Sequence, residues 1–95
     1  MSISVSQTAH QPKLEFAVDV RDDRGATHHT VTLDSATFAR LGAAHSATPE
    51  AFVHAVFEYL LEREPKESIM SRFDVTVVSR YFPEFEDEIP SYLSA

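Results

Sequence analysis

The stretch that decides the fold is residues 48–63, TPEAFVHAVFEYLLER. Thr48 is a favourable N-cap, Pro49 suits a first helical position because no N–H partner is needed there, and Glu50 places a negative charge at the positive end of the helix dipole. Pro65 disfavours α conformation in the residue before it. The sequence therefore predicts a helix that begins after Thr48 and ends one or two residues before this proline.

This central helix carries an unusually wide apolar face. With about 100° per residue, the apolar side chains cover an arc of roughly 180°, whereas the stripe of a surface helix commonly covers ~100°. They are Phe52, Val53, Val56, Phe57, Leu60 and Leu61. The side expected to face solvent carries Ala51, Ala55, Glu58 and Glu62, with His54 at its edge. So wide an apolar face needs cover on two sides.

The segment before the central helix predicts a β-hairpin. Apolar and polar residues alternate along residues 14–20 and again along residues 28–33, which is typical of half-buried strands. The polar residues 21–26 between them favour a turn. We therefore expect two antiparallel strands joined by a hairpin loop.

Short helices are expected on both sides of the central helix. Asp34 or Ser35 is a suitable cap for one that ends at Gly42. Apolar residues at positions 69, 70 and 73 fit a second helix of about two turns, with Pro65 near its start.

The sequence leaves open whether residues 74–82 form a strand or a helix. The run of β-branched residues at 75–78 has strand propensity, but the apolar residues that follow are separated by steps of three and four, which favours a helix. Asp74 is the expected N-cap of that helix. Pro83 is expected to open a new turn, and Pro90 to end it.

Length and composition place these elements in one domain. A chain of 95 residues, 43% of them hydrophobic, is large enough to build a single core. Residues 1–12 are rich in Ser, Thr and Gln, so we expect a flexible lead-in there and a single domain at 13–95. The predicted fold class is α+β: an N-terminal antiparallel β-hairpin followed by a central amphipathic helix and two or three shorter helices.

The composition also limits the class of function. The chain has no Cys, which excludes disulfides, thiolate nucleophiles and cysteine-ligated zinc. It shows no secretory leader and no apolar run of about 18 residues, so we expect a cytoplasmic protein without a membrane partner. The formal net charge of −7 makes the protein acidic, opposes binding to nucleic acid and favours basic partners.

No motif in the sequence indicates catalysis. Nucleophilic and acid–base catalysis need a nucleophile, a base and an orienting group, and no nucleophile elbow, phosphate loop or dinucleotide fingerprint occurs. We therefore expect no enzyme activity and no cofactor. His54 and Glu58 stand four residues apart on the central helix and match half of a metal site. A solvent-facing ion pair is the simpler interpretation of these two residues.

Several stretches are similar to a family of short uncharacterised bacterial proteins. They are residues 16–20, 29–33, 49–53, 57–65, 73–74 and 80–86, and the similarity spans residues 14–89. No activity, ligand or catalytic residue is assigned to that family. The resemblance implies a bacterial, cytoplasmic protein and adds no chemistry.

A second, partial resemblance concerns residues 29–63. Their layout of a strand, a capped helix, a turn and a second capped helix is similar to that of ribbon–helix–helix DNA-binding proteins and antitoxins. In that family, outward-facing strand residues read bases and a helix N-terminus holds a backbone phosphate. The corresponding positions are His28, Thr30, Thr32 and Thr48. Because Lys and Arg total only eight, nucleic-acid binding is the alternative rather than the leading interpretation.

The leading interpretation is a non-enzymatic protein that acts through self-association or through binding to another protein. A two-stranded hairpin is too small to cover both the central helix and the aromatic C-terminal segment. We therefore expect a homodimer, formed through the sheet edge or the central helix. The expected interface residues are Phe52, Val56, Phe57, Leu60, Tyr81, Phe82 and Phe85.

Overall fold

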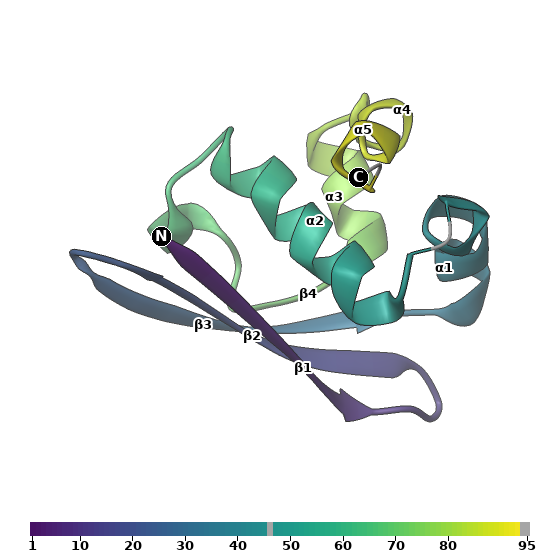
Figure 1. The fold of residues 1–95 in the computed structure, drawn as a ribbon, viewed down its shortest axis with the longest axis horizontal. Coiled ribbons are helices and arrows are strands. Elements are labelled where there is room, and N and C mark those ends of the chain that lie inside the picture. The colour runs from purple at the N-terminus through teal and green to yellow at the C-terminus, as the bar shows by residue number, and fades with distance from the viewer. Residues whose placement is uncertain (46, 94–95) are drawn as a thin grey trace.

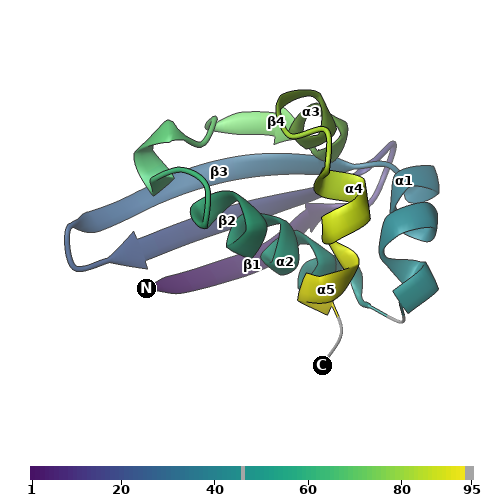
Figure 2. The same cartoon turned by 90° about the horizontal axis from the view of Figure 1, so that it is seen from above.

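A sheet and a set of helices form two layers in the computed structural model, which describes residues 1–45 and 47–93. The helices lie on one side of the sheet, and its other face is open (Figures 1 and 2). The strands are β1 Ser2–Ala9, β2 Leu14–Asp22, β3 Gly25–Leu33 and β4 Arg72–Asp74. The helices are α1 Ser35–Leu41, α2 Pro49–Leu61, α3 Val75–Tyr81, α4 Phe85–Glu88 and α5 Pro90–Leu93, with 3₁₀ turns η1 Ala43–His45 and η2 Lys66–Ser68. The predicted α+β class is confirmed.

The four strands pair in the order β1-β2-β3-β4. β1, β2 and β3 are antiparallel neighbours, and β4 runs parallel to β3. The predicted hairpin is confirmed, because β2 and β3 pair along their whole length, from Leu14 opposite Leu33 to Asp22 opposite Gly25. Gly25 has φ of 134°, a conformation that residues with a Cβ rarely adopt, so glycine suits this turn.

The first strand corrects the sequence analysis. The sequence predicts a flexible lead-in at residues 1–12, whereas the structure places β1 there. Ile3 and Val5 lie opposite Val20 and Val18 of β2 and pack against the core. Only two large apolar residues alternate with serine in this strand, so the local pattern is weak. Pairing with β2 is what makes the segment a strand.

The central helix is confirmed as α2. Thr48 is its N-cap and accepts a hydrogen bond from the Ala51 N–H at 3.1 Å. The helix ends at Leu61, slightly earlier than predicted. Of the six residues on the predicted wide apolar face, five are at most 4% exposed and Leu61 is partly buried. Ala55, which the sequence analysis places towards solvent, is 1% exposed because α2 also contacts β1.

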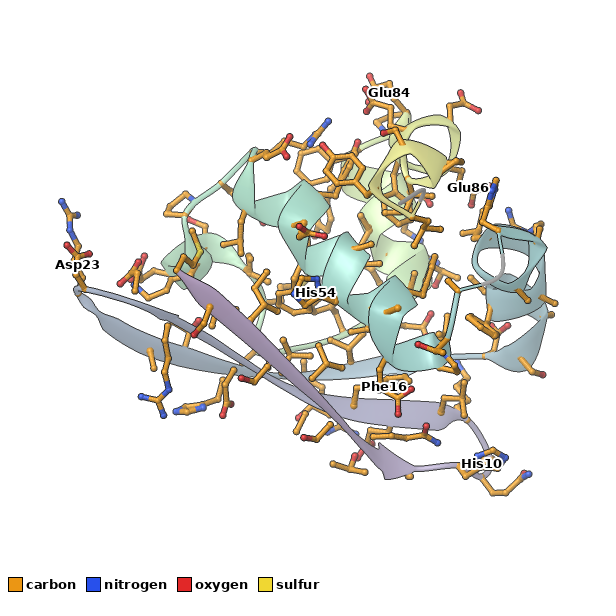
Figure 3. The ribbon with its side chains drawn as sticks, viewed as in Figure 1. His10, Phe16, Asp23, His54, Glu84 and Glu86 are labelled. Carbon is orange, nitrogen blue, oxygen red and sulfur yellow. The ribbon has the colours of Figure 1, made fainter. Side chains whose placement is uncertain are left out.

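The sheet supplies the cover that the sequence analysis assigns to a partner. Figure 3 shows Phe16 of β2 beneath α2, and this side chain is fully buried. The helix-facing residues Val18 and Val20 of β2 and Val31 of β3 are also fully buried. The wide face of α2 is therefore enclosed within one protomer and gives no reason to expect a homodimer.

The short helices begin at the predicted caps. Asp34 accepts a hydrogen bond from the Thr37 N–H at 2.7 Å at the start of α1, which ends at Gly42 as predicted. Asp74 caps α3 in the same way and accepts from the Thr76 N–H at 3.0 Å. The segment left open between helix and strand is therefore helical.

The chain after Pro65 differs from the sequence analysis at two places. Of the two-turn helix predicted to begin near Pro65, only the 3₁₀ turn η2 forms, and extended chain leads from Ile69 into β4. Phe73 of β4 lies opposite Val31 of β3 and is buried. β4 therefore adds a strand to the sheet and a side chain to the core. α4 ends at Glu88, just before Pro90 as predicted, but Pro90 then begins a further short helix, α5, which fits the tolerance of proline in a first helical turn.

Candidate functional site

A groove lies between the C-terminal half of α2, the connection from η2 to β4, and α3. We call it the α2–α3 groove, and its volume is about 390 Å³. It is lined by Leu60, Glu64, Ser68, Ile69, Met70, Phe73, Val77, Val78, Tyr81 and Phe82. Most of the side chains that line the groove are apolar.

The groove has an apolar floor and an exposed apolar rim. The floor consists of Leu60, Ile69, Phe73 and Val78, each at most 7% exposed. Tyr81 and Met70 stand at the rim and are 68% and 42% exposed. Apart from Met1, they are the large hydrophobic side chains that the described residues expose to water. Their position beside one groove makes this surface the candidate functional site.

His29 of β3 anchors the wall of the groove that carries Met70. The imidazole is 4% exposed, and its Nδ1 donates a hydrogen bond to the Met70 carbonyl at 2.8 Å. Its Nε2 accepts from the Thr27 hydroxyl at 2.8 Å. Because a carbonyl oxygen can only accept, Nδ1 carries the proton. The ring also packs against Phe57 of α2, with 5.2 Å between the centroids.

One carboxylate lines the groove. Glu64 follows the end of α2 and is partly buried. Within the described ranges, its carboxylate has no hydrogen-bond or ion-pair partner. Arg63 beside it is bound to Glu88 at 3.1 Å, and Arg72 of β4 lies 3.4 Å from Glu15. The groove thus combines an apolar floor with an uncompensated negative charge.

The seven predicted interface residues fall into two groups. Phe52, Val56, Phe57, Leu60 and Phe85 are at most 4% exposed within the protomer. These five side chains belong to the core of the protomer. Leu60 also lies on the floor of the α2–α3 groove, which Tyr81 and Phe82 line as well, and Tyr81 is exposed. Helical spacing identifies apolar positions, but it does not show whether the same chain or a partner covers them.

The two side chains of the predicted pair on α2 lie close together. His54 Nδ1 and Glu58 Oε1 lie 3.3 Å apart, and Figure 3 shows His54 on the helix above the sheet. Across residues 1–45 and 47–93, no group of three or more His, Cys, Asp or Glu side chains is arranged to hold a metal ion. The same residues include no helix with the length and apolar character needed to cross a bilayer.

The four positions implicated by the ribbon–helix–helix resemblance do not lie together. His28, Thr30 and Thr32 lie on the open face of β3, while Thr48 caps α2 in the helical layer. As alternation predicts, His28 is exposed on the face opposite to buried His29. β3 is an interior strand with β2 on one side and β4 on the other. Neither edge of β3 is therefore free for a strand of a second copy.

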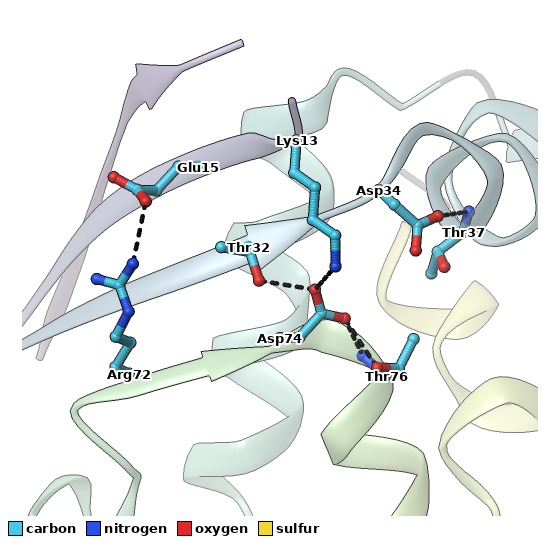
Figure 4. A network of polar contacts seen from close by, with 8 residues as sticks. All are labelled: Lys13, Glu15, Thr32, Asp34, Thr37, Arg72, Asp74 and Thr76. Atoms are coloured by element: carbon cyan, nitrogen blue, oxygen red, sulfur yellow. Dashed lines mark hydrogen bonds and ion pairs between the residues drawn. The ribbon is translucent and has the colours of Figure 1, made fainter. Parts of the chain in front are cut away.

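A polar network joins β4 and α3 to the rest of the open face (Figure 4). Asp74 accepts hydrogen bonds from the Thr32 hydroxyl at 2.6 Å and from the Lys13 ammonium at 3.2 Å. Burial alone raises the pKa of the Asp74 carboxyl, but the hydrogen bonds from Thr32 and Thr76 outweigh burial and lower the pKa. The network holds α3, one wall of the groove, against the sheet.

A second polar cluster ties the last helices to α2. The hydroxyl of fully buried Tyr59 donates to Glu88 Oε1 at 2.9 Å, and the Arg63 guanidinium lies 3.5 Å from the centre of the Tyr59 ring. Burial and the hydrogen bond to Glu88 raise the pKa of Tyr59 to about 12. The phenol therefore remains a donor at neutral pH. Tyr59 also packs edge-on against Phe82, Phe85 and Tyr92, so these aromatic C-terminal residues cover α2.

No family model, curated protein or solved structure matches the chain. The sequence predicts Leu60, Tyr81 and Phe82 as interface residues, but it assigns Met70 to a helix and gives Glu64 no role. The apolar cluster at 69–73 is a visible signal, but its place beside α3 depends on pairing between β3 and β4.

Proposed function

We propose that this protein acts by binding another protein and that the α2–α3 groove is the binding surface. The observation that carries the proposal is the exposure of Tyr81 and Met70 beside an apolar floor. Aromatic residues and Met are enriched at the centres of protein interfaces. A complex that removes these side chains from water gains the free energy of burying apolar surface.

The partner that fits this groove is a peptide segment with a large apolar side chain next to Lys or Arg. The apolar side chain would contact the floor, and the basic group would approach Glu64. Burying Glu64 beneath a neutral partner would leave a desolvated charge without compensation, which disfavours such partners. The net charge of −7 also attracts basic segments over a longer range.

Selection from a random displayed peptide library against the purified protein tests the proposal. We expect the selected peptides to combine Trp, Phe or Leu with Lys or Arg, and to shift the amide resonances of groove residues. Because Tyr81 is exposed, Tyr81→Ala should keep the fold and weaken peptide binding about tenfold or more, as measured by calorimetric titration. Glu64→Gln should weaken binding and reduce its salt dependence.

Glu58→Gln is the matched control for the charge change. Glu58 lies on the exposed surface of α2, and it lines no part of the α2–α3 groove. This variant should bind the selected peptides as the unchanged protein does. Peptides that bind Tyr81→Ala with undiminished affinity, or that shift resonances only outside the groove, contradict the proposal.

A further inference from the structure

The edge strand β1 has unpaired backbone groups on its outer side and no charged side chain that would prevent another strand from pairing there. β1 pairs only with β2, and none of its eight residues is Asp, Glu, Lys or Arg. In an antiparallel pair, every second residue directs its N–H and C=O towards the neighbouring strand, and the residues between direct theirs away. Proteins commonly protect long edge strands with charges or proline. β1 carries neither, so its outer side can accept another strand.

The available part of this edge is residues 2–7. A register shift between Gln7 and Ala9 interrupts the ladder with β2 near the end of β1. Such irregularities twist an edge and limit pairing beyond them. The opposite edge of the sheet, β4, has only three residues. β1 is therefore the edge with the longer regular stretch.

Residues 2–6 form a palindrome in side-chain class, Ser-Ile-Ser-Val-Ser. Two antiparallel copies related by a two-fold axis at Ser4 place each residue opposite its mirror position. Ser2 then faces Ser6, Ile3 faces Val5, and Ser4 faces Ser4 of the second copy. Because alternate side chains point to opposite faces, serines meet on the open face and aliphatic residues meet on the helix-covered face.

The aliphatic residues of β1 are incompletely covered in a single protomer. Ile3 and Val5 are partly buried, whereas the neighbouring residues Val18 and Val20 of β2 are fully buried. A second β1 strand would continue the sheet beside Ile3 and Val5. The pairing would thus bury apolar surface as well as satisfy backbone groups.

We infer that β1 pairs with β1 of a second copy of this chain to form a symmetric dimer with one continuous sheet. The palindrome selects a second copy over an unrelated strand, because every position meets its own side-chain class. The net charge of −7 on each copy opposes association, but the contacting strand is uncharged, so added salt should strengthen the dimer. The α2–α3 groove borders β4 at the opposite edge and stays open.

Sedimentation equilibrium over micromolar to submillimolar concentrations tests this inference. We expect the unchanged chain to form a dimer. Ser4→Lys places two like charges opposite each other at the two-fold axis and should raise the dissociation constant at least about fivefold. Ala17→Lys is the matched control, because Ala17 is exposed on the same face of the sheet but lies on β2. Mixing Ser4→Lys with Ser4→Glu should restore association.

A cysteine at the same position gives an independent measurement. Because the chain has no Cys, Ser4→Cys introduces a single thiol, which should form an intermolecular disulfide under mild oxidation. Ala17→Cys should not do so at the same concentration. Far-ultraviolet circular dichroism establishes that each variant is folded. A monomer at all concentrations, a dimer that Ser4→Lys leaves unchanged, or equal cross-linking of both Cys variants overturns the inference.

Discussion

His29 links a polar side chain in the core to the surface that we propose as functional. Its neighbour His28 is the same residue type, but it is exposed and contacts Asp19 at 2.6 Å. Strand alternation alone predicts that the two side chains point to opposite faces. It does not predict the bond from His29 to the Met70 carbonyl, because Met70 is distant in sequence and the bond forms only when the chain after η2 packs beside β3.

Replacing His29 should weaken both the fold and the groove. His29→Leu removes both hydrogen bonds and leaves the Met70 carbonyl without its imidazole donor, so the free energy of unfolding should fall by about 1–3 kcal/mol in urea denaturation. Affinity for groove-binding peptides should fall as well, because Met70 loses its anchor. His28→Leu should change the free energy of unfolding by less than about 1 kcal/mol. Equal effects of the two substitutions would contradict the anchoring role.

Asp74 connects three elements of the fold. It ends β4, caps α3 through the Thr76 N–H, and accepts a hydrogen bond from Thr32 of β3 (Figure 4). α3 carries Val77, Val78 and Tyr81 into the α2–α3 groove. This carboxylate therefore helps to position α3, together with the buried side chains of Val75 and Val78.

Asp74→Ala should lower the free energy of unfolding by about 1–2 kcal/mol at pH 7, the usual cost of losing an N-cap. The native pKa of Asp74 lies below its unfolded value, so its stabilisation is present above about pH 4 and is lost as the pH falls through the native pKa. The difference in the free energy of unfolding between the unchanged chain and Asp74→Ala should therefore become smaller at acidic pH. Urea denaturation measured from neutral to acidic pH checks this expectation.

A substitution at the hairpin tip is the control for this pH series. Figure 3 shows Asp23 at the turn between β2 and β3, where its side chain is exposed. Asp23→Asn should change the free energy of unfolding at pH 7 by no more than about 0.5 kcal/mol. If the free energies of unfolding of the unchanged chain and of Asp74→Ala differed by the same amount at every pH, the ionised carboxylate would not be the cause of the lost stability.

The elements that could be predicted from the sequence carry strong local signals. α2 has a cap, a proline at its first position and helical periodicity, and β2 and β3 alternate clearly around a polar turn. β1 and β4 were missed because a serine-rich strand and a three-residue strand depend on their neighbours for pairing. Since β4 places Phe73 and α3, the groove as a whole could not be predicted. Among its lining residues, only Leu60, Tyr81 and Phe82 were expected at an interface.

At the scale of the whole molecule, the two proposed contacts use opposite edges of one sheet. β1 would join a second copy, while the α2–α3 groove beside β4 would bind a peptide. A symmetric dimer would therefore carry two grooves, one near each outer edge. A partner with two copies of the binding segment would gain affinity if its linker spanned both grooves.

The strand β1 makes the stability of the whole protein depend on residues that the sequence analysis treats as a lead-in. Removing residues 2–9 takes away the pairing with β2 and uncovers Ala55, Val18 and Val20. The free energy of unfolding should fall by at least about 2 kcal/mol, because the loss of Ile3 and Val5 alone removes two aliphatic side chains from the margin of the core. Thermal denaturation followed by circular dichroism measures the change.

The control for this truncation keeps the strand and changes only its open face. The triple variant Ser2→Thr, Ser4→Thr and Ser6→Thr keeps the hydroxyl groups and a residue type that is common in strands. It should therefore unfold at nearly the temperature of the unchanged chain. A truncated chain with the same unfolding temperature would show that residues 1–12 are dispensable for the fold. It would also remove the structural basis for pairing between two β1 strands, since a strand that does not stabilise its own sheet is a poor template for another.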